Sequence, residues 1–109
     1  MRLETVGDVI AVRKLRLLDD SGREIQVKLG KPQPSSDLPG VEEYFCPFQI
    51  TGAGDEQVRY AAGVDAFQAI QLTLKLIGSE LLRLNKKLDG NLHWECDESG
   101  GFGFPTFEG

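Results

Sequence analysis

The sequence predicts an α+β fold: an antiparallel β-meander of about four strands, with one long α-helix packed on one face and an aromatic C-terminal tail or short strand. Three observations predict it. Four strand-like segments come first, one segment with helical periodicity follows them, and 109 residues are too few for two separate cores. Residues 1–109 are therefore predicted to form a single domain.

The first two strands are predicted to form a hairpin. They span residues 9–18 and 24–29, and residues 19–23 between them are rich in turn-forming types. The register that places most apolar partners on one face pairs Leu17 with Ile25, Leu15 with Val27, and Arg13 with Leu29. On the other face this register sets Lys14 beside Lys28, a like-charge pair that costs stability.

Residues 30–40 are predicted to be a surface loop, because they hold three of the five prolines and show no apolar periodicity. A third strand is expected over residues 43–51 and a fourth over 58–62, joined by a turn over 52–57.

The second hairpin continues the same apolar face. Pairing Ile50 with Val58 and Phe48 with Tyr60 places large apolar side chains together. Arg59 is then predicted to lie on the opposite, open face.

The helix is expected to begin after Asp65, a suitable N-cap, with Gln68 in the capping-box position. Lysines 86 and 87 lie where the helix dipole favours cations, and Gly90 supplies a stop. Seven apolar residues recur at alternating steps of three and four: Phe67, Ile70, Leu74, Ile77, Leu81, Leu84 and Leu88. After four strands, packing on a sheet is favoured over a coiled-coil seam.

A second apolar arc, formed by Ala69, Leu72 and Leu76, lies on the side of the helix away from Phe67 and needs a cover. The Gly/Phe-rich tail over residues 99–109 and the segment before it supply large apolar side chains: Leu92, Trp94, Phe102, Phe104 and Phe107. We expect these residues to wrap the chain's own helix; a second chain covering the arc is the alternative.

The sequence lacks the common signatures of catalysis and metal binding. It contains no G-x-S-x-G, Walker-type or G-x-G-x-x-G motif, and its one histidine, His93, has no partner at a metal-ligand spacing. Cys46 and Cys96 are expected to be reduced, buried and structural. We predict no catalytic, cofactor-binding or metal-binding residue. A small-ligand or minor enzymatic site near His93, using His93 or Glu95, is the alternative.

Charge and hydropathy exclude other classes. Twelve lysines and arginines against seventeen acids give a formal net charge of −5, which disfavours nucleic-acid binding. The start of the chain has no secretory pattern, and the most apolar long stretch, residues 66–84, includes Lys75, Glu80 and Arg83. We therefore expect a cytoplasmic protein with no membrane association.

One predicted surface carries the functional hypothesis. The open face of the sheet gathers four cations opposed only by Glu24: Lys14, Arg16, Lys28 and Arg59. These cations can simply discourage strand pairing. We predict a non-catalytic protein-interaction module, a monomer or weak homodimer. The sharper hypothesis for the basic face is that it binds an acidic protein surface or an anionic ligand.

Three stretches together resemble a known family. They are residues 44–52 (YFCPFQITG), residues 62–70 (AGVDAFQAI) and residues 103–105 (GFP). The combination is similar to a family of small, mostly bacterial proteins grouped as a domain of unknown function, over roughly residues 29–105. The resemblance implies a single α+β domain; no activity, cofactor or catalytic residue carries over from it.

Overall fold

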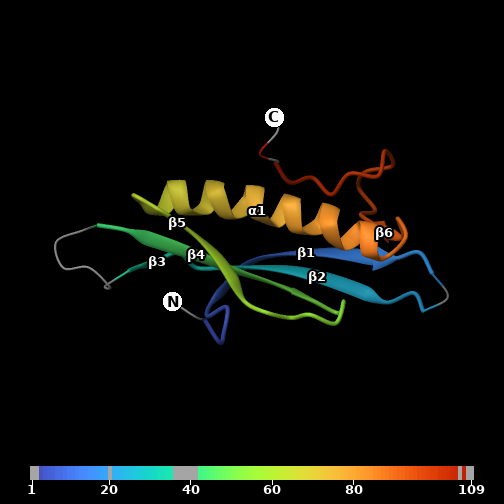
Figure 1. Ribbon diagram of the computed structural model, residues 1–109, viewed down its shortest axis with the longest axis horizontal. Coiled ribbons are helices and arrows are strands. Elements are labelled where there is room, and N and C mark those ends of the chain that lie inside the picture. The colour runs from blue at the N-terminus through green and yellow to red at the C-terminus, as the bar shows by residue number, and fades with distance from the viewer. Residues whose placement is uncertain (1–2, 20, 36–41, 106, 108–109) are drawn as a thin grey trace.

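A computed structural model describes residues 3–19, 21–35, 42–105 and 107. A twisted sheet lies beneath a single long helix, and the C-terminal segment returns along the helix on the same side of the sheet (Figure 1). The elements within the described residues are β1 (Val9–Leu17), β2 (Glu24–Gly30), β3 (Gln33–Pro34), β4 (Tyr44–Thr51), β5 (Arg59–Gly63), α1 (Ala66–Lys87) and β6 (Leu92–His93).

The predicted fold class is confirmed. Strands β1, β2, β4 and β5 pair antiparallel in chain order, as a meander does, and β6 adds to the other side of β1.

One correction concerns residues 30–40, which were expected to be loop throughout. Gln33 and Pro34 pair with Phe45 and Tyr44 as the short edge strand β3, a position that tolerates proline. Residues 36–40 lie outside the described part.

The predicted register of the first hairpin is wrong by two residues. Leu15 pairs with Ile25 and Lys14 with Gln26, so Lys14 and Lys28 are not direct partners. The loop begins one residue earlier than expected, because the Leu17 N–H donates to the Arg23 carbonyl and closes the hairpin at that pair. A shift of two residues keeps every side chain on its predicted face, since side chains alternate with a period of two.

The predicted register of the second hairpin is wrong by one residue, which does change faces. Phe48 pairs with Arg59 and Pro47 with Tyr60. Tyr60 thus reaches the outer face, where its ring meets Phe45 edge-on at 5.9 Å between centroids. Val6 of the N-terminal segment lies against Pro47 and Gly30 on the same face. This outer apolar cluster favours the observed register.

The helix begins as predicted but is turned about its axis. Asp65 accepts the Gln68 N–H at 2.7 Å, and the Gln68 side chain accepts the Val64 N–H at 2.8 Å. The fully buried positions are Ala69, Thr73, Ile77, Gly78 and Leu81. Phe67, predicted to be in the buried stripe, is 79% exposed.

Small residues explain this rotation. At Gly63 of β5, a Cβ would lie 2.6 Å from the Ala69 nitrogen, so the first turns of α1 approach β5 very closely. The helix therefore packs mainly on β4 and β5. Leu76 of the second arc borders a hollow with Leu3 and Tyr60, on the β5 side of the helix. The tail, expected to cover that arc, instead lies over Gly78, where a Cβ would meet the Pro105 carbonyl at 2.4 Å.

Thr73 is the one buried polar side chain among the described residues, and it joins three elements. Its hydroxyl donates to the Cys46 carbonyl of β4 at 2.8 Å and accepts the Ala61 N–H of β5 at 3.2 Å. A single α1 side chain thus satisfies two backbone groups from adjacent strands.

We expect Thr73→Val to lower the free energy of unfolding by about 1–3 kcal/mol, because the isosteric methyl leaves a buried carbonyl and a buried N–H without partners. Thr73→Ser keeps the hydroxyl and should be milder. Urea unfolding followed by circular dichroism measures both variants. Equal stabilities for Thr73→Val and the parent would contradict the bridging role.

Candidate functional site

Three of the four predicted basic residues share the outer face of the sheet. Lys14 and Arg16 on β1 and Lys28 on β2 lie on the side away from α1, and the first two border a shallow hollow of about 450 Å³. Arg16 is offset by acids: its guanidinium is 3.3 Å from the Glu95 carboxylate, and its strand partner is Glu24. Lys14 and Lys28 have no carboxylate within 4.0 Å among the described residues.

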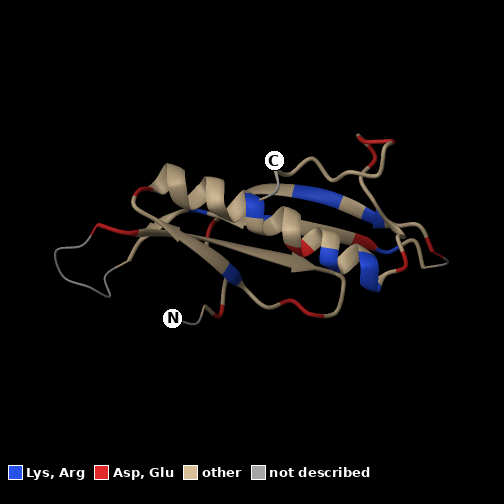
Figure 2. Cartoon of the chain, turned by 45° about the horizontal axis from the view of Figure 1, so that its top comes forward, with Lys and Arg blue, Asp and Glu red and all other residues tan. Residues whose placement is uncertain are grey.

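Arg59, the fourth residue predicted for that face, lies on the helix side. Its guanidinium is 3.3 Å from Asp55 and 3.9 Å from Glu80, and Glu80 also binds Arg83 at 2.8 Å. These groups line a hollow of about 210 Å³ between the loop after β4 and the second half of α1. Arg59 lies on the helix side because the register of the second hairpin differs by one residue from the predicted one. Figure 2 marks the basic and acidic positions along α1 and β1.

Strand β1 has an open edge that sequence reasoning missed. The Leu17 N–H bonds to Arg23 on the β2 side, whereas the Leu18 N–H bonds to Asn91 on the β6 side. Because backbone groups alternate between the two sides in an antiparallel ladder, those of Val12 and Lys14 point away from β2. Strand β6 pairs only with Arg16 and Leu17. Among the described residues, the backbone groups of Val12 and Lys14 therefore have no strand partner.

Exposed aliphatic side chains accompany this open edge. Val9, Ile10 and Val12 are 42%, 53% and 50% exposed. Unpaired backbone groups beside β-branched side chains form a template on which another strand can pair. The sequence does not predict this edge, because the edge depends on how short β6 is.

Arg13, on the inner face of β1, holds the C-terminal segment in place. Its guanidinium carbon lies 4.1 Å from the Trp94 ring centroid and 4.7 Å from that of Phe104, so the cation contacts two aromatic rings. It also donates to the Phe102 carbonyl at 3.0 Å. Gly103 is required here, because a Cβ would meet the Trp94 ring at 2.4 Å.

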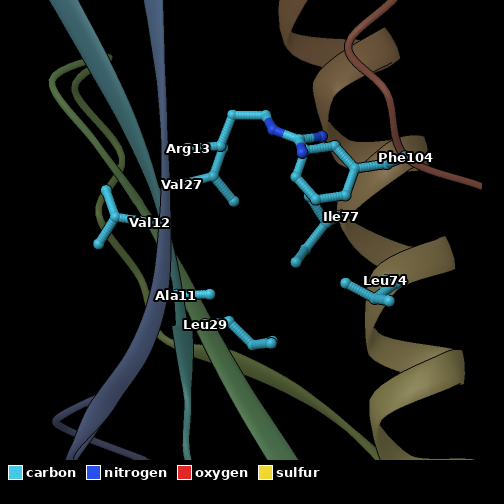
Figure 3. A pocket seen from close by; sticks show the side chains of 8 residues that line it. All are labelled: Ala11, Val12, Arg13, Val27, Leu29, Leu74, Ile77 and Phe104. Carbon is cyan, nitrogen blue, oxygen red and sulfur yellow. The ribbon is translucent and has the colours of Figure 1, made fainter.

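A cavity of about 170 Å³ lies beside this stack, between β1 and α1. Figure 3 shows aliphatic side chains of the sheet facing those of the helix, with Arg13 and Phe104 at one end. The lining residues are Ala11, Val12, Arg13, Val27, Leu29, Leu74, Ile77 and Phe104. In the sequence, the sign of this cavity was a charged residue, Arg13, at an inward position of the strand, with the small residue Ala11 at the preceding inward position.

The residues considered for catalysis lie apart. His93 pairs across the sheet with Arg16, and the hollow beside it is lined by Arg16 and Glu95 but not by His93. Cys46 is buried, as predicted, and burial raises the pKa of its thiol. Cys96 is exposed, so its predicted burial is wrong; the segment after β6 leaves the sheet at that point. No group of three or more candidate metal ligands occurs among the described residues.

Two acidic turns share one construction. Asp19 accepts hydrogen bonds from the side chain and N–H of Ser21, and Asp97 does the same with Ser99. These bonds lower the pKa of both carboxyls. Both acids thus stabilise turns in their ionised form.

The two cysteines should differ sharply in reactivity. At neutral pH, a bulky thiol reagent should label Cys96 within the mixing time and Cys46 only as fast as the domain opens, because Cys46 is buried and its raised pKa keeps it a thiol. Mass spectrometry of digests measures each rate, with Cys96→Ala as control. Fast labelling of Cys46 in the folded protein would contradict its burial.

Gly78 offers a test of how the tail packs. In an open helix, Gly→Ala is stabilising by about 1 kcal/mol. Here Gly78→Ala should be destabilising, because the new Cβ meets the Pro105 carbonyl, and cleavage after Trp94 by a limiting protease should accelerate. An increase in melting temperature would show that the tail does not press on the helix.

Comparison with known proteins gives a family. A family model described as Domain of unknown function (DUF6968) matches residues 11–106, which include all three stretches behind the predicted resemblance. No curated protein and no solved structure matches the sequence. No helix in the described ranges is long and apolar enough to cross a membrane.

Proposed function

The chain belongs to the DUF6968 family, and we propose that this member is a non-catalytic protein-interaction module that pairs an extended, acidic segment of another protein with the open edge of β1. The observation that carries the proposal is the backbone of Val12 and Lys14, whose groups point away from β2 beyond the end of β6. An extended segment supplies the missing hydrogen-bond partners without any change in the fold.

The side chains beside the edge define the partner. Val12 and Ile10 are half exposed and suit the β-branched residues of an added strand. Lys14 and Lys28, neither opposed by a carboxylate within 4.0 Å, supply positive charge on the same face. Acidic side chains alternating with apolar ones match this pattern.

Arg16 contributes less positive charge to this surface than the sequence suggested, because the carboxylates of Glu95 and Glu24 already offset its charge. Arg59 does not belong to this surface. Two lysines against one open edge support electrostatic steering and choice of partner more than raw affinity.

The alternative of a small-ligand or enzymatic site near His93 has less support, since that side chain does not line the hollow beside it. We also propose a cytoplasmic location, which agrees with two free cysteines.

A peptide titration followed by the protein's amide signals tests the proposal. The probe is a short synthetic peptide in which valine and glutamate alternate, added to isotope-labelled protein. Amide signals of Val12 and Lys14 should shift more than those of Arg13 and Leu15, whose backbone groups face β2. Binding should weaken as salt rises, because the charges are exposed.

Matched variants separate backbone from charge. Val12→Pro removes a donor that no neighbouring strand uses and should abolish binding, whereas Val12→Thr keeps the N–H and should bind normally. Lys14→Glu with Lys28→Glu should weaken binding roughly tenfold, about 1.4 kcal/mol. Equal binding of a valine–lysine peptide would overturn the acidic partner, and a stable dimer without peptide would assign the edge to a second copy.

A further inference from the structure

We propose that the cavity between β1 and α1 is a binding site for a small carboxylate with an apolar body, held by Arg13 at one end of the cavity. This site lies on the inner side of the sheet and shares Val12 with the open edge, although the Val12 side chain points away from the other lining side chains (Figure 3).

The cavity exists because of two residues of β1. At the inward positions 11 and 13, this strand supplies an alanine and an arginine, whereas positions 15 and 17 supply leucines that are buried. Helix α1 packs most closely on β4 and β5, and its Leu74 and Ile77 face this part of β1 across the cavity. Apolar volume is therefore missing between Leu29 and Leu74.

The size of the cavity limits its occupant. An apolar cavity of roughly 150 Å³ holds a benzene molecule. At about 170 Å³, this cavity holds one ring or a short branched chain, and it is too small for a long fatty acid. Aliphatic walls from the sheet and from the helix, seen facing each other in Figure 3, exclude a hydrated sugar or phosphate body.

The charge of Arg13 selects an anion. Arg16, Arg59 and Arg83 each have a carboxylate within 4.0 Å, but among the described residues Arg13 has none. The rings of Trp94 and Phe104 lie against its guanidinium, and one N–H donates to the Phe102 carbonyl.

A guanidinium carries five N–H donors in one plane. Among the described residues, only one hydrogen bond from Arg13 is formed, so its remaining in-plane donors are available to a ligand. The contacts with two rings and the hydrogen bond to Phe102 restrict the movement of the group. A carboxylate can then accept charge-assisted hydrogen bonds from an already oriented donor.

Benzoate is the probe, with benzamide as the neutral analogue of the same shape. Trp94 is the only tryptophan and lies against Arg13, so its emission reports occupancy. Benzoate should change Trp94 emission saturably and shift the methyl signals of Leu29, Leu74 and Ile77. Benzamide should bind at least tenfold more weakly.

Two variants make the assignment specific. Arg13→Gln keeps a donor for the Phe102 carbonyl but removes the charge, and it should abolish the preference for benzoate over benzamide. Ala11→Leu fills the cavity with the fold intact and should abolish binding of both, with an unchanged circular dichroism spectrum as the control. Equal binding of the two probes, unchanged benzoate binding by Ala11→Leu, or no saturable binding would each overturn the proposal.

Discussion

The position of α1 depends on one close approach. Gly63 lets the helix backbone at Ala69 lie against β5, and one turn later the Thr73 hydroxyl bridges β4 and β5. These contacts fix both the rotation of the helix and its lateral position over the sheet. Because α1 packs most closely on β4 and β5, part of the inner faces of β1 and β2 is left for the tail to cover.

The C-terminal segment completes the core for that reason. Leu92 and Phe102 are buried, and Trp94 and Phe104 pack against the same core. Helix and tail meet at Gly78, where the absence of a side chain lets the Pro105 carbonyl reach the helix. The cavity beside Arg13 lies at the junction of these two covers. Its presence is thus a consequence of using one helix and one tail where a second helix would have filled the space.

The sequence predicts the faces of the strands better than their registers. Alternation correctly assigns Lys14, Leu15 and Lys28, because a two-residue slip leaves each on the same face. Arg59 fails, because the competing outer cluster of Phe45, Tyr60 and Val6 combines residues far apart in the chain. The apolar stripe likewise wrongly predicts that Phe67 is buried. The rotation of the helix is set by small and polar residues, which an analysis of hydrophobic periodicity does not include. The open edge was equally invisible, since it reflects where β6 ends.

The stack on Arg13 also has a kinetic consequence. Arg13 and Phe102 are 89 positions apart in the sequence, whereas β4, β5 and α1 are consecutive. Loop closure over the longer separation costs more chain entropy. The consecutive elements therefore assemble first, and the contacts between Arg13 and the tail form late. Until the tail docks, the part of the sheet that it covers remains in contact with water. Burial of the core is therefore completed late in folding.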